Sequence, residues 1–217
     1  MTRYRNILFD LDGTLVDSGE GILKCAALAL ETLKKPLPTP EEMRTFVGPP
    51  LVDSFMRFGC TAEEAEEAVR IYRSRYTVTG KYEGFVYPGI EALLQQLKAD
   101  GCRLFVATSK PETTAIDVLT KFGLAPYFEH IIGATFDRSR STKSEVIAYL
   151  LETVGDVSHA LMVGDTAFDV VGAARHGIPC VGVSWGYGTV ESIEEAHPIA
   201  IVDNTEALCN LITGSRV

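Results

Sequence analysis

Two aspartates separated by a single residue follow a short apolar segment near the start of the chain. Residues 7–9 predict a buried strand, and Asp10, Asp12 and Gly13 come directly after it. A sharp turn at Gly13 would bring both carboxylates to one side, although residues two apart on extended backbone point to opposite faces. Carboxylates gathered in this way can bind a hard cation, attack a substrate or transfer a proton.

The same residues also have a purely structural interpretation. Asp-Gly is a common hairpin turn, so Asp12 and Gly13 could join two antiparallel strands. The next segment, residues 19–35, favours a helix instead, because its apolar side chains recur at helical spacing. A strand, an acidic turn and a helix in succession are typical of α/β proteins, whose ligands bind at the carboxyl ends of strands.

Three later segments place further reactive groups at strand ends or helix starts. Thr108 and Ser109 offer hydroxyls just before a helix, where backbone N–H groups attract an oxyanion, although Ser109 could equally cap that helix. Lys143 lies in a first helical turn, where the dipole disfavours a cation. This placement suggests a role in neutralising a phosphate, with a solvated surface lysine as the alternative. Asp165 and Asp169 lie one helical turn apart, where one of them could also be a cap.

The elements that must position these groups alternate from residue 84 onward. The strands are predicted at 103–107, 131–132, 160–163, 180–183 and 199–202, and the helices at 90–97, 111–122, 142–151 and 167–176. This succession predicts an α/β fold, a Rossmann-like parallel sheet with helices on both faces.

Residues 18–83 interrupt the alternation with helical patterns alone. Thr61 and Glu64, for example, form the capping-box pattern that marks a helix start. We therefore expect an α/β catalytic core of residues 1–17 and 84–217 and an inserted all-α cap domain of residues 18–83. Because the insert follows the acidic turn directly, it is expected to act as a lid.

Composition excludes several classes of protein. The 217 residues are 46% hydrophobic and 23% charged, which suits an ordinary globular core. A net charge of −9 disfavours a nucleic acid polymer as partner but allows a small phosphate. Five scattered cysteines favour reduced thiols over disulfides or zinc. With neither a signal peptide nor a long apolar run, a cytoplasmic protein without membrane binding is expected. The oligomeric state stays undetermined.

Taken in chain order, the acidic pair, the hydroxyl pair, the lysine and the second acidic pair resemble the four motifs of the haloacid dehalogenase-like (HAD) hydrolase superfamily. The resemblance covers essentially the whole chain, and the helical insert is similar to the cap domain that follows the first motif in that family. The dehalogenase branch lacks the second acid of the opening motif, whereas Asp12 is present here. The chain thus resembles the phosphatase branch, in particular phosphoglycolate phosphatase-like and nucleotidase-like members.

The resemblance implies a role for each group in phosphoryl transfer. Asp10 would attack phosphorus and form an aspartyl-phosphate. Asp12 would protonate the leaving alkoxide and then deprotonate the attacking water. Thr108, Ser109 and Lys143 would bind the phosphoryl oxygens and stabilise their negative charge.

It also implies a magnesium site. Asp10, the backbone carbonyl of Asp12 and Asp165 would hold Mg²⁺, with Asp169 orienting the ligands or their waters. Few carboxylates completed by water and phosphate are what Mg²⁺ prefers. A cation and a lysine would also offset the repulsion among four carboxylates.

Substrate choice is expected in the insert. The turn that contains Gly48 and Pro49 is either a substrate-binding loop or a plain connection between helices. The arginine of residues 139–143 is expected to add positive potential at the entrance. The size of the protein and its lid favour a small phosphorylated metabolite as the substrate.

Four alternative functions remain. A β-phosphoglucomutase-like mutase would share all the catalytic groups named above and differ in the acceptor of the phosphoryl group. A 5'-nucleotidase would differ only in its substrate. Residues 182–186 match the Gly-x-Ser-x-Gly elbow of serine hydrolases, which would need Glu191 or Glu194 together with His197. A non-catalytic binding module would keep the fold alone, but the complete set of acids favours an enzyme.

Overall fold

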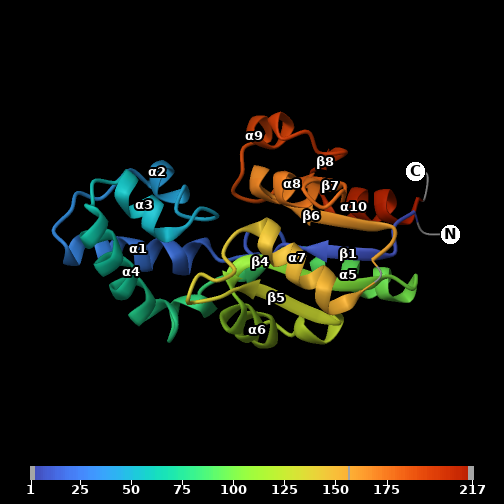
Figure 1. Ribbon diagram of the computed structural model, residues 1–217, viewed down its shortest axis with the longest axis horizontal. Helices are drawn as coiled ribbons and strands as arrows, with labels where there is room; N and C mark the ends of the chain where they lie inside the picture. Colours follow the sequence, from blue (N-terminus) through green and yellow to red (C-terminus); the bar gives the residue numbers. More distant parts are fainter. Residues whose placement is uncertain (1–2, 156, 215–217) are drawn as a thin grey trace. The chain divides into compact units, whose positions relative to one another are not determined.

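The computed structural model describes residues 3–155 and 157–214 (Figure 1). The chain divides into two compact units. One consists of Met1–Val16 and Val86–Val217, and the other is the intervening segment Asp17–Phe85.

A six-stranded parallel sheet forms the centre of the larger unit. Its strands, in the order in which they lie side by side, are β5 (His130–Ala134), β4 (Arg103–Pro111), β1 (Asn6–Phe9), β6 (Ala160–Gly164), β7 (Cys180–Val183) and β8 (Ala200–Val202). β1 lies between β4 and β6 and is buried along its whole length. A parallel strand covered on both faces is expected to be continuously apolar in this way.

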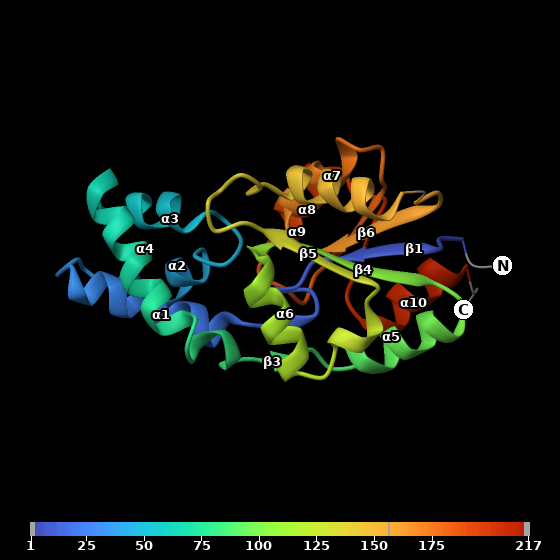
Figure 2. The same cartoon turned by 60° about the horizontal axis from the view of Figure 1, so that its bottom comes forward.

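Helices cover both faces of the sheet, as Figure 2 shows. On one face lie α5 (Ile90–Ala99), α6 (Glu112–Lys121), the short 3-10 turn η2 (Ala125–Tyr127) and α10 (Thr205–Thr213); on the other lie α7 (Lys143–Val154), α8 (Ala167–Ala174) and α9 (Val190–Glu195). Alternate side chains of β1 point to opposite faces of the sheet. Ile7 and Phe9 pack in the hydrophobic core on one face, and Leu8 packs in the core on the other. The predicted Rossmann-like fold class is confirmed.

The smaller unit is helical. Its elements are α1 (Gly19–Thr32), α2 (Pro40–Arg44), α3 (Leu51–Arg57), α4 (Ala62–Tyr76) and the 3-10 turn η1 (Gly80–Tyr82). Buried faces of α1 and α4 pack against each other, and Phe46 packs on the rings of Phe55 and Phe58. A separate two-stranded sheet of β2 (Val16–Asp17) and β3 (Phe85–Val86) lies where the chain passes from one unit to the other.

Several local predictions are confirmed and others need correction. Thr61 and Glu64 form the expected capping box of α4. β4 was expected to end at residue 107 but continues to Pro111, because Pro111 pairs with Ala134 of β5 after a shift in register. Pro111 therefore precedes α6 as an extended residue and does not begin the helix. The short helix α9 was not predicted, since it has less than two turns.

Across the described residues, no helix has both the length and the apolar character needed to cross a membrane.

Candidate active site

Three aspartates gather where β1 and β6 end. Asp10 follows β1, Asp165 follows β6, and Asp169 lies in the first turn of α8. Each offers a carboxylate oxygen, and these oxygens lie within 4.8 Å of one another. Because β1 and β6 are neighbours in a parallel sheet, the Asp10 amide also donates to the carbonyl of Val163, at 2.9 Å. We call this group the acidic cluster. It lies beside β1, where the direction of strand order reverses and α/β sheets bind ligands.

Lys143 extends into the acidic cluster from the first residue of α7. Its Nζ lies 2.8 Å from Asp10 Oδ1 and 2.8 Å from Asp169 Oδ1, and it donates to the carbonyl of Ala107 at 2.9 Å. The side chain is only 4% exposed. Burial alone would lower the pKa of Lys143, but the negative charges of Asp10 and Asp169 raise it above its ordinary value. Lys143 is therefore a buried, charged lysine rather than a surface residue.

The carboxylates of the cluster are not neutralised by Lys143 alone. Burial raises the pKa of Asp10 to about 6, against the opposing charge of Lys143 and with a further contribution from Asp169. Burial also raises the pKa of Asp165 well above its usual value, and repulsion from Asp169 and Asp10 adds to this rise. Three carboxylates and one ammonium group leave an excess of negative charge in a region of low polarity.

The carboxylate oxygens of the acidic cluster are suitable ligands for a hard cation. Asp169 Oδ1 is buried, and its contact is the ion pair with Lys143 Nζ at 2.8 Å. The other oxygen, Asp169 Oδ2, accepts from the amide and the hydroxyl of Thr166, at 3.1 and 2.9 Å. Asp169 therefore caps α8 and faces the cluster at once. Carboxylate oxygens at such separations fit a magnesium-like ion.

Asp165 is held by residues whose contact with it was not predicted from the sequence. Thr14 Oγ1 donates to Asp165 Oδ1 at 3.2 Å, and the amide of Tyr187 donates to Oδ2 at 2.8 Å. The indole of Trp185 donates in turn to the carbonyl of Thr14, at 3.1 Å. A Cβ added at Gly186 would overlap the Asp165 side chain, so only glycine allows this close approach.

The second acid of the opening pair has a different partner. Gly13 turns the chain with φ of 85°, and Asp12 pairs with Lys110 of the β4 tail instead of joining the acidic cluster. Lys110 was missed, although it lies two residues after Thr108 at the end of the same strand. That spacing is the signal that could have revealed it.

The predicted hydroxyl pair lies in the irregular end of β4. Thr108 is buried, and its Oγ1 accepts from the amide of Lys110 at 3.2 Å. Ser109 does not cap α6, whose N-cap is Pro111 and lacks a side-chain cap. The capping alternative for Ser109 is therefore wrong, while its role toward a phosphate stays a prediction.

One further expectation changes, that for Arg140, while that for Gly48 and Pro49 does not. Arg140 does not offer an unpaired charge, because its guanidinium lies 2.7 Å from Glu112 and also donates to the carbonyl of Gly133. Arg140 instead ties the chain before α7 to the start of α6. Gly48 and Pro49 lie between α2 and α3 in the smaller unit, and Gly48 has φ of 107°. Their contact with a substrate stays a prediction.

The serine hydrolase alternative is wrong. An elbow requires the serine between a strand and a helix that follows at once. Ser184 follows β7, but its hydroxyl donates to the carbonyl of Val202 at 3.4 Å, and α9 begins only at Val190. The glycine at 186 in this motif is explained by its packing against Asp165.

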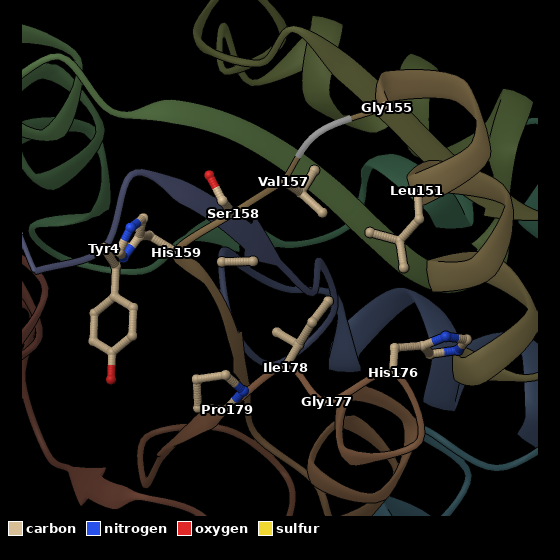
Figure 3. Close-up of a pocket in the computed structure, with 11 residues that line it drawn as sticks. Tyr4, Leu151, Gly155, Val157, Ser158, His159, His176, Gly177, Ile178 and Pro179 are labelled. Atoms are coloured by element: carbon tan, nitrogen blue, oxygen red, sulfur yellow. The ribbon is translucent and has the colours of Figure 1, made fainter.

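A separate cavity lies at the opposite ends of the strands. Its volume is about 490 Å³, and Figure 3 shows residues before β6 and β7, among them His159 and Pro179, together with Tyr4 and His176 around it. Among the described residues that line it, none belongs to the acidic cluster or to the predicted site. The cavity is therefore separate from the acidic cluster.

Comparison with known proteins places this geometry in a family. Residues 7–183 match the model of the haloacid dehalogenase-like hydrolases. A 5'-nucleotidase of Pseudomonas aeruginosa is 42% identical over 198 residues, which cover 90% of each chain. A plasmid-encoded phosphoglycolate phosphatase of Cupriavidus necator is 31% identical over 217 residues, covering 97% of this chain and 94% of the relative.

A solved structure shares the fold as well. The structure of protein tyrosine kinase A (PtkA) of Mycobacterium tuberculosis has a TM-score of 0.86, with 38% identity over 96% of this chain and 98% of that one. Similarity therefore extends to relatives with several different names, and the substrate does not follow from it. The family match and the two curated relatives confirm the predicted resemblance: the chain is a phosphatase that belongs to the haloacid dehalogenase-like hydrolase family.

Proposed function

We propose that this phosphatase hydrolyses a small phosphomonoester in two steps, with Asp10 as the nucleophile and Mg²⁺ as the cofactor. The observation that carries the proposal is the convergence of Asp10, Asp165, Asp169 and Lys143 from β1, β6, α8 and α7. Residues distant in the sequence gather hard oxygen ligands and one buried ammonium group, as phosphoryl transfer requires.

In the first step, a carboxylate oxygen of Asp10 forms a bond to phosphorus while the bond from phosphorus to the leaving oxygen breaks. Asp10 Oδ1 is already oriented, because it accepts from the amide of Leu11 at 2.7 Å and lies 2.8 Å from Lys143. Asp12 gives its proton to the leaving alkoxide. Lys143 and the hydroxyls of Thr108 and Ser109 stabilise the phosphoryl oxygens.

In the second step, Asp12 takes a proton from water, whose oxygen attacks phosphorus and breaks the bond to Asp10. Inorganic phosphate leaves, and the Asp10 carboxylate is restored. Asp10, Asp165 and the backbone carbonyl of Asp12 would hold Mg²⁺, and Asp169 would support this arrangement. When bound, Mg²⁺ offsets the charge of the carboxylates and of the phosphoryl oxygens.

Under this proposal, the helical segment Asp17–Phe85 is a cap domain that selects the substrate. Its support is its position in the chain directly after the opening motif and its compactness as a separate unit. Gly48 and Pro49 are the proposed contacts with the substrate. The cysteines, all unpaired, agree with a reducing compartment, so we extend the proposal to a cytoplasmic location.

A substrate screen tests the proposal. Phosphoglycolate, nucleoside 5'-monophosphates and sugar phosphates are each incubated with Mg²⁺, and free phosphate is measured. We expect release from at least one small ester, with phosphoglycolate and nucleoside monophosphates as the first candidates because the two curated relatives carry those names. The Asp10→Asn variant is the matched control, and it should release none. Conversion of a sugar phosphate into its isomer, without free phosphate, would show the mutase instead.

A further inference from the structure

A second buried lysine contacts the proposed site outside the acidic cluster. Lys110 Nζ donates to both carboxylate oxygens of Asp12, at 2.8 Å to Oδ1 and 2.7 Å to Oδ2. The side chains are 3% and 18% exposed, so the pair is largely removed from water. Ion pairs of this kind are geometrically demanding, because the cost of burying two charges is offset only by close contacts.

The backbone around Lys110 fixes the origin of its side chain. Lys110 lies in the irregular stretch of β4 between the paired residues Ala107 and Pro111, and its amide donates to Thr108 Oγ1 at 3.2 Å. Its carbonyl packs so closely on Gly133 of β5 that no Cβ would fit there. Lys110 therefore does not extend from a mobile surface segment, and its ammonium group is held in a defined place.

We propose that Lys110 is a positioning residue for Asp12, an inference that rests on the proposed function. Asp12 follows the strand on a turn, and its carboxylate could rotate about two side-chain bonds. Contact with both oxygens fixes the plane of the carboxylate. A general acid must lie within hydrogen-bond reach of the atom that it protonates, and a small displacement reduces its efficiency greatly.

The role of Lys110 is confined to the two proton transfers. In the first, the Asp12 proton passes to the leaving oxygen as the bond from phosphorus to that oxygen breaks. In the second, a water proton passes to Asp12 as the bond from phosphorus to Asp10 breaks. An alkyl ester needs the first transfer because an alkoxide is a poor leaving group. A p-nitrophenyl ester needs it little, because nitrophenolate is weakly basic.

The test compares Lys110→Met with Lys121→Met, which removes the same charge from an exposed position at the end of α6. We expect Lys110→Met to lower kcat/KM about 100-fold for the best alkyl ester of the screen, within the range of general acid catalysis. The loss for p-nitrophenyl phosphate should be less than about 3-fold. The ratio kcat/KM reports the first step, in which only the alkyl ester needs the Asp12 proton, whereas the second step is the same for both esters. Lys121→Met should match the wild type with both esters. Equal losses of kcat/KM on the two esters, or a change in KM with an unchanged kcat for the alkyl ester, would overturn the inference.

Two further measurements separate positioning from a loss of fold. In an Asp12→Asn background, Lys110→Met should cause no further fall in alkyl ester turnover, because the group that it positions no longer transfers a proton. A crystal structure of Lys110→Met should show the Asp12 carboxylate displaced from its present orientation. If the Asp12 carboxylate keeps its orientation in Lys110→Met, the positioning role is refuted, even if no ester is hydrolysed. If the wild-type protein hydrolyses none of the esters, the proposed function is refuted separately.

Discussion

Lys143 is the one cation that contacts the acidic cluster within the described part of the chain. A lysine at the first position of a helix is disfavoured by the helix dipole. Its placement becomes favourable only because Asp10 and Asp169 lie 2.8 Å away. The chain thus places a single positive charge between the proposed nucleophile and a proposed metal-supporting acid.

Replacing Lys143 by Met removes this charge at nearly constant volume. We expect kcat for phosphate release to fall by at least about 100-fold, as on removal of a group that stabilises developing charge in a transition state. Steady-state assays measure the fall, and circular dichroism should show an unchanged fold. A variant with wild-type kcat would contradict the role of Lys143 in phosphoryl transfer.

Divalent metal should stabilise the protein through the three aspartates. A ligand that binds only the folded state at 100 times its dissociation constant adds about 2.7 kcal/mol. We therefore expect MgCl₂ to raise the melting temperature of the wild type, and EDTA to abolish phosphate release.

The matched control for this prediction is Asp165→Asn, which keeps the side-chain shape but removes one carboxylate charge. Its melting temperature should respond little to MgCl₂. Full activity of the wild type in EDTA, or an equal response of the two proteins to MgCl₂, would refute the metal site.

At the scale of elements, the segment between β7 and α9 acts as a support for Asp165. Tyr187 donates its amide to Asp165, and Gly186 packs against the same side chain. The glycines here allow the backbone to approach a carboxylate closely. A loop that looks like a simple connection therefore forms one wall of the proposed metal site.

Gly186→Ala should disturb this wall, because the added Cβ overlaps the Asp165 side chain. We expect weaker Mg²⁺ binding, seen as a concentration for half-maximal activity raised about 10-fold, which corresponds to about 1.4 kcal/mol. Ser184→Ala in the same segment is the control and should keep full activity. Loss of activity in Ser184→Ala, or covalent labelling of Ser184 by a fluorophosphonate, would revive the serine hydrolase interpretation.

The sequence was most informative where chemistry and local structure coincide. The strand that ends at Asp10 and the capping box at Thr61 follow from local patterns, so both were predicted correctly. The pairing of Lys110 with Asp12 depends on a register shift in β4, which no local pattern encodes. The contact of Tyr187 with Asp165 spans distant parts of the chain and depends on the packing of β6 beside β7.

At the scale of the whole molecule, the chain folds as two compact units, one built from a sheet and helices and the other mainly from helices. The α/β unit contains the acidic cluster, and the helical unit contains Gly48 and Pro49. Under the proposed function, in which the helical unit selects the substrate, this division would allow the chemistry and the choice of substrate to vary independently. Relatives named a 5'-nucleotidase and a phosphoglycolate phosphatase are consistent with that division.

Pro49→Ala tests this division of roles. The proline stiffens the connection between α2 and α3, and its loss should raise KM for the natural ester about 5-fold, the effect of roughly 1 kcal/mol of binding energy. The kcat should stay near the wild-type value, because no group of the acidic cluster changes. Pro36→Ala, an exposed proline of the same unit, is the control. Equal KM values for the two variants would argue against substrate contact at Pro49.

Trp185 gives the protein an optical property that needs no label. It is the only tryptophan in the chain, and its indole reaches Asp165 through Thr14 alone. Fluorescence excited in this ring therefore originates a few bonds from the acidic cluster. A metal ion that binds Asp165 should change the fluorescence emission of Trp185. Stopped-flow fluorescence could therefore follow metal binding in real time without any substrate present.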